Sequence, residues 1–358
     1  MVQEDFLRID GHKLLFHPHR VADWLDGKTI APLYMEISPT GLCNHRCLFC
    51  AKDYIGYPAR FLDAGLLCKR LVELGTFGVR SIMYGGEGEP LLHPDLALIV
   101  EQTRSAGIDV AMSTNGVLLS RELSAKILPL MSWLKVSINA GTSAGYATIH
   151  QTDESDFHTV LENLTCAANL VKDNGWACTL GAQAVLLPDN AGEMEELAVR
   201  IRETGVSYLV IKPYSQHHSS HTQTYSRIDY SRYDELAVQL ARLATDRFSV
   251  IFRRHAMAKL QRAERGFDRC QALPFWSYID SAGNVWGCSS YIGDDRFCYG
   301  NINQSSYREI WEGARRQRSL EFVATGLETE RCRLNCRMDE VNRYLCELTH
   351  PSKHVNFI

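Results

Sequence analysis

Residues 38–53 read SPTGLCNHRCLFCAKD and contain three cysteines, Cys43, Cys47 and Cys50, in the spacing Cys-x3-Cys-x2-Cys. This stretch directly follows a short apolar run that is typical of a buried strand. Three thiolates so close in sequence can hold one metal core from a single loop, as iron–sulfur clusters require, and leave a further metal position open. A zinc site is the alternative, with His45 as the fourth ligand that zinc usually takes.

The cysteine stretch opens a regular alternation of short apolar runs and longer amphipathic segments, between about residues 34 and 213. Such strand–helix alternation predicts a parallel sheet, and six units predict an α/β fold with a partial (β/α)6 TIM-like barrel. Site residues of such a barrel lie at the C-terminal ends of its strands. The predicted strands are Tyr34–Ser38, Ser81–Tyr84, Val110–Ser113, Leu134–Ile138, Thr179–Leu186 and Tyr208–Ile211. The predicted helices between them lie within residues 61–75, 93–107, 157–175 and 194–205.

The pattern changes after the barrel. A helix is expected near Tyr233–Thr245 and a strand over residues 248–253, and a hairpin is expected to join Phe275–Ile279 to Val285–Cys288. The remaining residues are dotted with cysteines and end in a helical pattern. We therefore expect an N-terminal extension (1–33), a barrel (34–250), and a bridging segment with a small C-terminal domain (251–358).

Composition excludes several classes of protein. Of the 358 residues 45% are hydrophobic and 22% are charged, which is ordinary for a globular protein, and the net charge of −4 disfavours general binding to nucleic acid or anionic membranes. We find no run of about 18 apolar residues, and the N-terminal stretch MVQEDFLRIDGHKLLF does not resemble a signal peptide. Twelve cysteines without an export signal favour bound metal over disulfides, and we expect a cytoplasmic protein.

The first cysteine stretch resembles that of the radical S-adenosylmethionine (SAM) superfamily, including the aromatic residue Phe49 before the last cysteine and the position after the first strand. The resemblance implies that Cys43, Cys47 and Cys50 hold a [4Fe-4S] cluster whose open iron binds the amino and carboxylate groups of SAM. In that family an electron from the cluster cleaves SAM to methionine and a 5′-deoxyadenosyl radical, which abstracts hydrogen from the substrate. The protein supplies orientation and excludes solvent.

A glycine-rich turn follows the second predicted strand. It resembles the GGE motif of the same family, which implies that it holds the amino group of SAM. Two registers match: one glutamate follows two glycines, and the other precedes Pro-Leu-Leu. The cofactor-binding candidates in the turn are Gly85, Gly86, Glu87, Gly88 and Glu89.

Short polar side chains end the next strands of the predicted barrel. Ser113 and Asn115 lie at the end of the third strand, and Ser137 and Asn139 lie at the end of the fourth. They suit hydrogen bonds to a ribose, and capping of the loops, which uses the same residue types, is the alternative. Gln183, in the fifth strand, either points into the barrel or faces a helix terminus.

The sixth predicted strand ends in IKPYSQHH, where Lys212 is the candidate for contact with substrate. Arg253 and Arg254 are further candidates for binding an anionic group. A solvated loop is the alternative for all of these residues.

Six cysteines follow residue 269, and their arrangement resembles the SPASM and twitch extensions of some radical SAM enzymes. The full SPASM pattern has seven cysteines, so the resemblance implies one auxiliary [4Fe-4S] cluster, which we expect on Cys270, Cys288, Cys332 and Cys336. Cys298 and Cys346 are alternative ligands, and Cys298 is also a candidate catalytic hydrogen donor. Cys68, Cys166 and Cys178 are expected to pack in helices and a strand.

The resemblance implies a SAM-cleaving enzyme that receives electrons from a flavodoxin or ferredoxin. We expect a small polar substrate, such as a sugar, nucleoside or aminoglycoside, because only residues 1–33 precede the barrel, where many peptide-modifying relatives carry a leader-binding domain. The auxiliary cluster would assist dehydrogenation, epimerisation or sulfur transfer. The alternatives are a maturase of a ribosomally made peptide and a non-enzymatic iron–sulfur protein that senses redox state or binds a partner.

Overall fold

The computed structural model describes residues 8–9, 11–262 and 265–357. Residues 1–7 and 10 of the expected N-terminal extension lie outside the described residues. The described strands form one sheet in the order β10-β9-β8-β1-β2-β3-β4-β5-β6-β7. The strands are β1 Tyr34–Ile37, β2 Ser81–Tyr84, β3 Asp109–Thr114, β4 Met131–Ser137, β5 Thr179–Leu186, β6 Tyr208–Pro213, β7 Ser249–Phe252, β8 Trp276–Ile279, β9 Asn284–Trp286 and β10 Cys298–Asn301.

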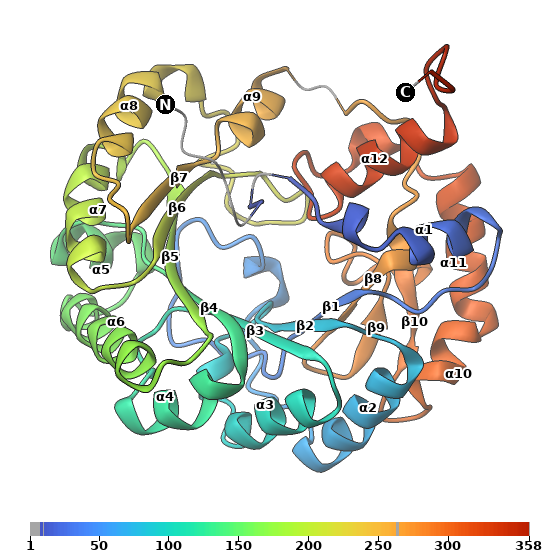
Figure 1. Cartoon of the computed structure of the whole chain (residues 1–358), viewed down its shortest axis with the longest axis horizontal. Helices are drawn as coiled ribbons and strands as arrows, with labels where there is room; N and C mark the ends of the chain where they lie inside the picture. Colours follow the sequence, from blue (N-terminus) through green and yellow to red (C-terminus); the bar gives the residue numbers. More distant parts are fainter. Residues whose placement is uncertain (1–7, 10, 263–264, 358) are drawn as a thin grey trace.

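Strands β1 to β7 are parallel and neighbour one another in chain order, and the helices that connect them lie outside the curved sheet (Figure 1). This arrangement confirms the partial barrel expected from the strand–helix alternation. The helices are α1 Pro18–Leu25, α2 Ala64–Phe77, α3 Leu96–Ser105, α4 Arg121–Ile127, α5 Ser143–His150, α6 Ser155–Asn174, α7 Met194–Glu203, α8 Asp234–Ala241, α9 Arg254–Arg262, α10 Tyr307–Glu312, α11 Ala314–Thr325 and α12 Asp339–Thr349.

Local sequence signals set the helix ends. Asp63 and Ser120 accept hydrogen bonds from backbone N–H groups in the first turns of α2 and α4, as N-cap residues do. Gly78 and Gly175 follow α2 and α6 with positive φ angles, so they take the left-handed conformation that glycine adopts without steric cost. The four predicted helices of the barrel, α2, α3, α6 and α7, thus begin and end close to where the sequence predicts, whereas α4 and α5 were not among the predicted ranges.

The main core lies between the strands and the outer helices. Outward-facing strand residues such as Ile82, Leu134 and Leu209 are buried against helix residues such as Leu71 and Ile201. Burial of these apolar side chains fixes which strand residues face outward, and their alternates face the inside of the barrel. The polar residues of the site lie on this inner face.

A second core joins the two ends of the chain. Val21 from α1 and Leu33 belong to the same buried cluster as Trp286, Phe297 and Leu345 of the C-terminal part. In Figure 1, α1 lies beside α11 and α12. The N-terminal extension therefore packs against the C-terminal region.

The C-terminal hairpin extends the barrel sheet. β8 pairs in parallel with β1, and β9 pairs antiparallel with β8. The predicted hairpin is confirmed, whereas β10, which pairs with β9, was not predicted. The expected domain boundary at residue 250 falls within β7, which pairs with β6 and so belongs to the barrel sheet.

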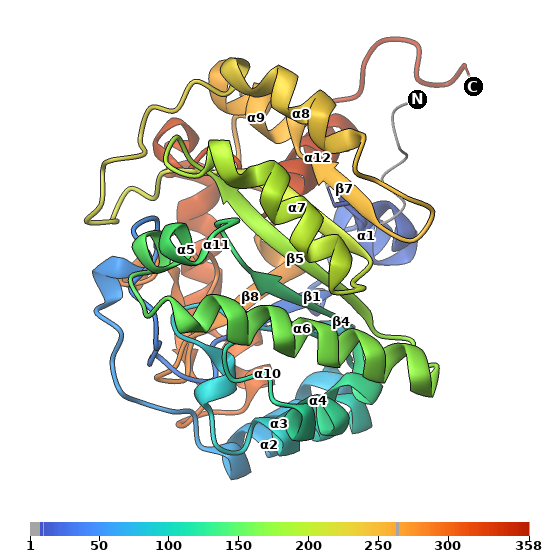
Figure 2. The same cartoon turned by 90° about the vertical axis from the view of Figure 1, so that its left-hand side faces the viewer.

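Figure 2 shows the long helices α6 and α7 crossing the outside of the barrel, with the C-terminal part behind the strands. Within the described residues, no helix combines the length and apolar character that a membrane crossing requires.

Candidate active site

The loop after β1 brings Cys43, Cys47 and Cys50 to the C-terminal ends of the strands. The backbone N–H of Leu48 donates to the Ile149 carbonyl (2.9 Å), and the N–H of Cys50 donates to the Cys47 carbonyl (3.0 Å). Burial, together with the charges of Glu89 and Cys50, raises the pKa of Cys43 to about 11. Three thiols that influence one another within a folded loop are a suitable donor set for one iron–sulfur cluster, whose positive charge would favour the thiolates.

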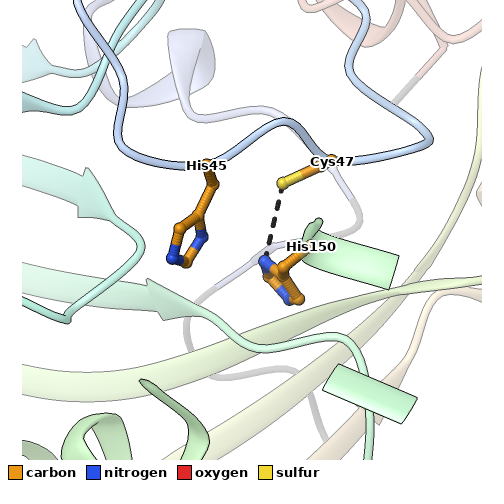
Figure 3. A group of neighbouring side chains, drawn as sticks. All are labelled: His45, Cys47 and His150. Carbon is orange, nitrogen blue, oxygen red and sulfur yellow. Dashed lines mark hydrogen bonds between the residues drawn. The ribbon is translucent and has the colours of Figure 1, made fainter. Parts of the chain in front are cut away.

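His45 and His150 lie beside Cys47, and the ligand atoms of the three residues are within 4.8 Å of one another (Figure 3). The backbone N–H of Asn139 donates to Nε2 of His150 (3.2 Å), so this nitrogen carries the lone pair and Nδ1 carries the hydrogen. Nδ1 lies 3.5 Å from Sγ of Cys47 and donates to it. His45 directs Nε2 at Asp156 (3.2 Å). This arrangement favours His150 as a hydrogen-bond donor to the Cys47 sulfur over the alternative of a zinc site.

The glycine-rich turn places its two glutamates in different surroundings. Glu89 lies beside the cysteine loop: its backbone N–H donates to the Leu42 carbonyl (2.9 Å), and its carboxylate accepts from Thr114 Oγ1 (2.5 Å) and from the Asn115 N–H (2.7 Å). A Cβ on Gly88 would lie 2.3 Å from the Leu42 carbonyl oxygen, so only glycine allows this approach. Burial raises the pKa of Glu89 to about 6.

Glu87 instead faces the C-terminal region. Its carboxylate accepts from the Ser281 hydroxyl (2.5 Å) and backbone N–H (3.1 Å), and its other oxygen is buried without a partner among the described residues. Gly86, with φ +112°, lies against the Tyr278 ring of β8. The geometry therefore separates the two registers: Gly88 and Glu89 lie at the cysteine loop, and Gly86 and Glu87 lie at the C-terminal hairpin.

Polar side chains from four neighbouring strands form a line on the inner face of the barrel. Nε2 of Gln183 donates to the hydroxyl of Ser137 (2.7 Å) and to that of Ser113 (3.4 Å). Nζ of Lys212 donates to Oε1 of Gln183 (3.1 Å). Gln183 thus points into the barrel rather than to a helix terminus, and the candidates from β3 to β6 are brought together.

The side chains of Asn115 and Asn139, unlike those of Ser113 and Ser137, bond to groups outside this line of polar residues. Asn139 is buried; its Oδ1 accepts from the Val185 N–H (2.7 Å), and its Nδ2 lies 3.1 Å from Nε2 of His150. Asn115 donates from Nδ2 to Oδ1 of Asn44 in the cysteine loop (2.6 Å). Asn139 therefore positions His150, and Asn115 joins β3 to the cysteine loop.

The four expected auxiliary ligands line one cavity in the C-terminal region, together with apolar side chains such as Leu273, Trp276, Phe297 and Leu327. Burial, together with the charges of the neighbouring cysteines Cys270 and Cys332, raises the pKa of Cys288 to about 12. An apolar cavity with four thiols fits the donor set and the dry surroundings of a [4Fe-4S] cluster. The cysteines are Cys270, Cys288, Cys332 and Cys336.

Cys298 and Cys346 are not among the residues that line this cavity. Cys298 lies on the outer strand β10, where its thiol lies 3.9 Å from the Gly300 carbonyl oxygen. Cys346 lies in α12. These positions give no support to Cys298 as a hydrogen donor at the barrel mouth or to either cysteine as an auxiliary ligand.

Several charged residues of the inner face were not predicted from the sequence. Glu36 of β1 forms an ion pair with Arg337, and Lys135 of β4 lies on the same inner face as Ser137. The alternation of side chains along each strand could have predicted them. Each charged residue interrupts an apolar run, and its neighbours on both sides are apolar residues that face outward. His150 had no such signal, because it ends a helix about a hundred residues beyond the cysteine that it contacts.

Comparisons with known proteins agree with this geometry. A model of the radical SAM superfamily matches residues 37–201, and a model of an iron–sulfur cluster-binding domain, SPASM, matches residues 270–337. The chain is 34% identical over 129 residues to GTP 3′,8-cyclase of Chlorobaculum tepidum, a match that covers 36% of this chain and 38% of that protein. It is 34% identical over 99 residues to a tungsten-containing aldehyde ferredoxin oxidoreductase cofactor-modifying protein of Pyrococcus furiosus, over 27% of each chain. The chain thus spans less than two fifths of the length of these curated relatives.

Two solved structures share the fold. Streptococcus suis SuiB bound to its precursor peptide SuiA has a TM-score of 0.63 at 16% identity, covering 84% of this chain and 69% of that chain. The enzyme anSMEcpe with AdoMet and a Cp18Cys peptide has a TM-score of 0.57 at 19% identity, covering 87% and 88%. The two matching models therefore identify a radical SAM domain over residues 37–201 and a SPASM iron–sulfur domain over residues 270–337 of this chain, and each domain contains one of the two cysteine sets.

Proposed function

We propose that this enzyme cleaves SAM reductively and uses the resulting 5′-deoxyadenosyl radical to abstract hydrogen from a small polar substrate. The observation that carries the proposal is the meeting of the three-cysteine loop with Glu89 and the polar ends of β3 to β6. When bound on Cys43, Cys47 and Cys50, a [4Fe-4S] cluster supplies the electron for SAM cleavage. The residues of the chain bind and orient SAM and exclude water.

Glu89 is the residue that we assign to the amino group of SAM. Its carboxylate is buried beside the cysteine loop and, with two accepting oxygens, retains capacity for an ammonium donor beyond the hydrogen bonds from Thr114, Leu91 and Asn115. Ser113, Ser137 and Gln183 would then contact the ribose or adenine from the neighbouring strand ends. Gly85, Gly86 and Glu87 would shape the side of the site that faces the C-terminal region.

We assign one auxiliary [4Fe-4S] cluster to Cys270, Cys288, Cys332 and Cys336. Four protein ligands leave no open iron, so the cluster would accept or pass an electron rather than bind substrate. This arrangement favours dehydrogenation over sulfur transfer. A flavodoxin or ferredoxin is the proposed electron donor to the first cluster.

We further propose that residues 34–250, with the remainder of β7, supply the SAM-cleaving unit and that the residues from there to 358 supply the auxiliary unit. Residues 1–33 would support the auxiliary unit through the shared core described above. Lys212, at the end of β6, is the proposed contact with substrate.

The proposal is tested by anaerobic reconstitution, reduction with dithionite, and quantification of 5′-deoxyadenosine by mass spectrometry. We expect its formation with SAM and a SAM-dependent change in the EPR signal of the reduced cluster. The absence of both would overturn the proposal. Incubation with candidate sugars and nucleosides would then separate dehydrogenation, which gives a product two hydrogens lighter, from epimerisation, which consumes SAM without net oxidation. Turnover of peptides alone would favour the maturase alternative.

A further inference from the structure

The inner face of the barrel carries a cluster of cations that the assignments above leave largely unused. Lys135 on β4 and Lys212 on β6 are half-buried there. Lys52 enters from the cysteine loop, and Arg333 and Arg337 enter from the cysteine-rich C-terminal segment. The cations thus come from two strands of the barrel, from the cysteine loop and from the C-terminal segment.

Most of these cations contact neutral groups. Nζ of Lys52 donates to the Ser289 carbonyl (2.6 Å), and Nε of Arg333 donates to the Ser215 hydroxyl (3.1 Å). Among the described residues, Lys212 donates only to the Gln183 amide oxygen, and Nζ of Lys135 lies 5.3 Å from the centre of the Trp133 ring.

The acidic groups nearby do not balance these charges. Arg337 is paired with Glu36, but within the described part of the chain no carboxylate lies within ion-pair distance of Lys52, Lys135, Lys212 or Arg333. Half-buried ammonium groups without a counter-ion are unfavourable in a folded protein.

Burial and neighbouring positive charges lower the pKa values of the two strand lysines, Lys135 and Lys212. Burial, and then the positive charges of Arg337 and Arg253, lower the pKa of Lys135 to about 8. Burial lowers the pKa of Lys212 too, and the charge of Lys135 is the next cause. A bound anion would relieve this repulsion and restore both lysines to the charged form.

The cysteines of the auxiliary iron–sulfur site offer negative charge to some of these cations but not to the two lysines on the strands. Cys288 is among the charges that act on Lys52, and Cys336 is among those that act on Arg333. Besides burial, the groups that shift the pKa values of Lys135 and Lys212 are other cations and, for Lys135, the carboxylate of Glu36. No cysteine is among them. SAM brings a single carboxylate, and its one negative charge would leave this group of cations with a net positive charge.

We propose, building on the function assigned above, that Lys135 and Lys212 bind an oxyanion group of the small substrate, a phosphate or a carboxylate. Each lysine offers a point charge with three donors, which suits either group. The amide oxygen of Gln183, on β5 between the strands of the two lysines, accepts from Lys212 and would hold its ammonium group in place for the anion. The anion would thereby fix the substrate on the inner face of the barrel, at the strand ends where SAM is assigned.

The test is isothermal titration of the reconstituted, SAM-loaded enzyme with three matched sugars: glucose 6-phosphate, glucuronate and neutral glucose. We expect at least one anionic sugar to bind more tightly than glucose. Lys135→Gln and Lys212→Gln should each weaken that binding about tenfold or more, because each removes a charge-assisted hydrogen bond. Lys172→Gln, which changes an exposed lysine of α6, should bind as the wild type does.

The two anionic sugars distinguish a phosphate from a carboxylate as the group recognised. Lys135→Arg and Lys212→Arg should retain binding, and iron content and circular dichroism should show that all variants fold. Equal affinity for all three sugars would overturn the inference. So would tighter binding of a tetraglutamate peptide than of the anionic sugars, and so would glutamine variants that lose affinity for SAM but not for the anionic sugars. If the wild-type enzyme cleaves SAM but binds neither anionic sugar, the inference is wrong and the proposed function stands.

Discussion

The two cysteine sites of this protein are built in opposite ways. In the loop after β1, Cys43, Cys47 and Cys50 come from one short stretch and face polar strand ends. In the C-terminal region, four cysteines from distant positions line an apolar cavity. A three-cysteine site beside polar groups leaves an iron free for a small-molecule ligand, whereas four thiols in an apolar cavity leave none. The contrast teaches that the first site is suited to chemistry and the second to electron transfer.

The largest effect on the difference between the two sites is expected when a cluster ligand of the first site is removed. In Cys47→Ser, we expect 5′-deoxyadenosine formation to fall below detection and iron to fall from about eight to about four atoms per chain. Iron analysis and mass spectrometry give the two readouts. Cys166→Ser, a cysteine of α6 outside both sites, is the matched control and should behave as the wild type does. Persistent SAM cleavage in Cys47→Ser would contradict the assignment.

Removal of a ligand from the second site should separate the two roles. In Cys336→Ala we expect about four iron atoms per chain, continued SAM cleavage, and strongly reduced conversion of substrate, because the electron from the substrate radical then has no acceptor. EPR of the reduced variant should retain the SAM-dependent signal. If SAM cleavage were lost together with the auxiliary iron, the division into a chemical and an electron-transfer site would be wrong.

A smaller effect distinguishes the two glutamates of the glycine-rich turn. Glu89→Gln should weaken SAM binding by roughly tenfold to a hundredfold, the loss expected for a charge-assisted hydrogen bond, whereas Glu87→Gln should change it much less. Titration calorimetry with SAM on the oxidised, reconstituted enzyme measures both. A larger loss in Glu87→Gln would assign SAM to the other register.

The pH dependence of SAM binding follows from the same carboxyl group. Burial raises the pKa of Glu89 to about 6, so the group is ionised above this pH and protonated below it. Only the ionised form attracts the ammonium of SAM, and SAM affinity should therefore fall as pH falls through about 6. The Glu89→Gln variant should lack this dependence, and a wild-type profile that is flat between pH 5 and pH 7 would count against the assignment.

The comparison also explains what the sequence could predict. The first site is local, since one loop supplies its ligands, and the barrel is a repetition of local strand and helix patterns. The second site needed the resemblance to a known extension, because tertiary packing brings its cysteines together across the segment from Cys270 to Cys336. β10 was missed because Cys298–Asn301 is short and contains glycine; its pairing with β9 is what makes it a strand.

The polar residues of the barrel also could be predicted only in part from the sequence. Ser137 and Gln183 could be placed from their position at strand ends, and the structure brings them together. Asn139 has the same kind of position, yet its hydrogen bonds to Val185 and His150 occupy it within the scaffold. Position along a strand predicts which side chains face inward, but only packing decides which of them remain available for a ligand.

The smallest predicted effect concerns how the protein tunes the first cluster. Nδ1 of His150 donates to the Cys47 sulfur, and hydrogen bonds to cluster sulfurs favour the reduced, more negative state. His150→Ala should therefore lower the midpoint potential of the first cluster by roughly 40 mV, the one-electron equivalent of a hydrogen bond worth about 1 kcal/mol. An EPR-monitored redox titration measures the shift, with His158→Ala, an exposed histidine of α6, as the control. An unchanged potential at full iron occupancy would mean that His150 only supports the loop. A shift confined to the first cluster would support separate roles for the two sites, because His150 is not among the residues that line the second site.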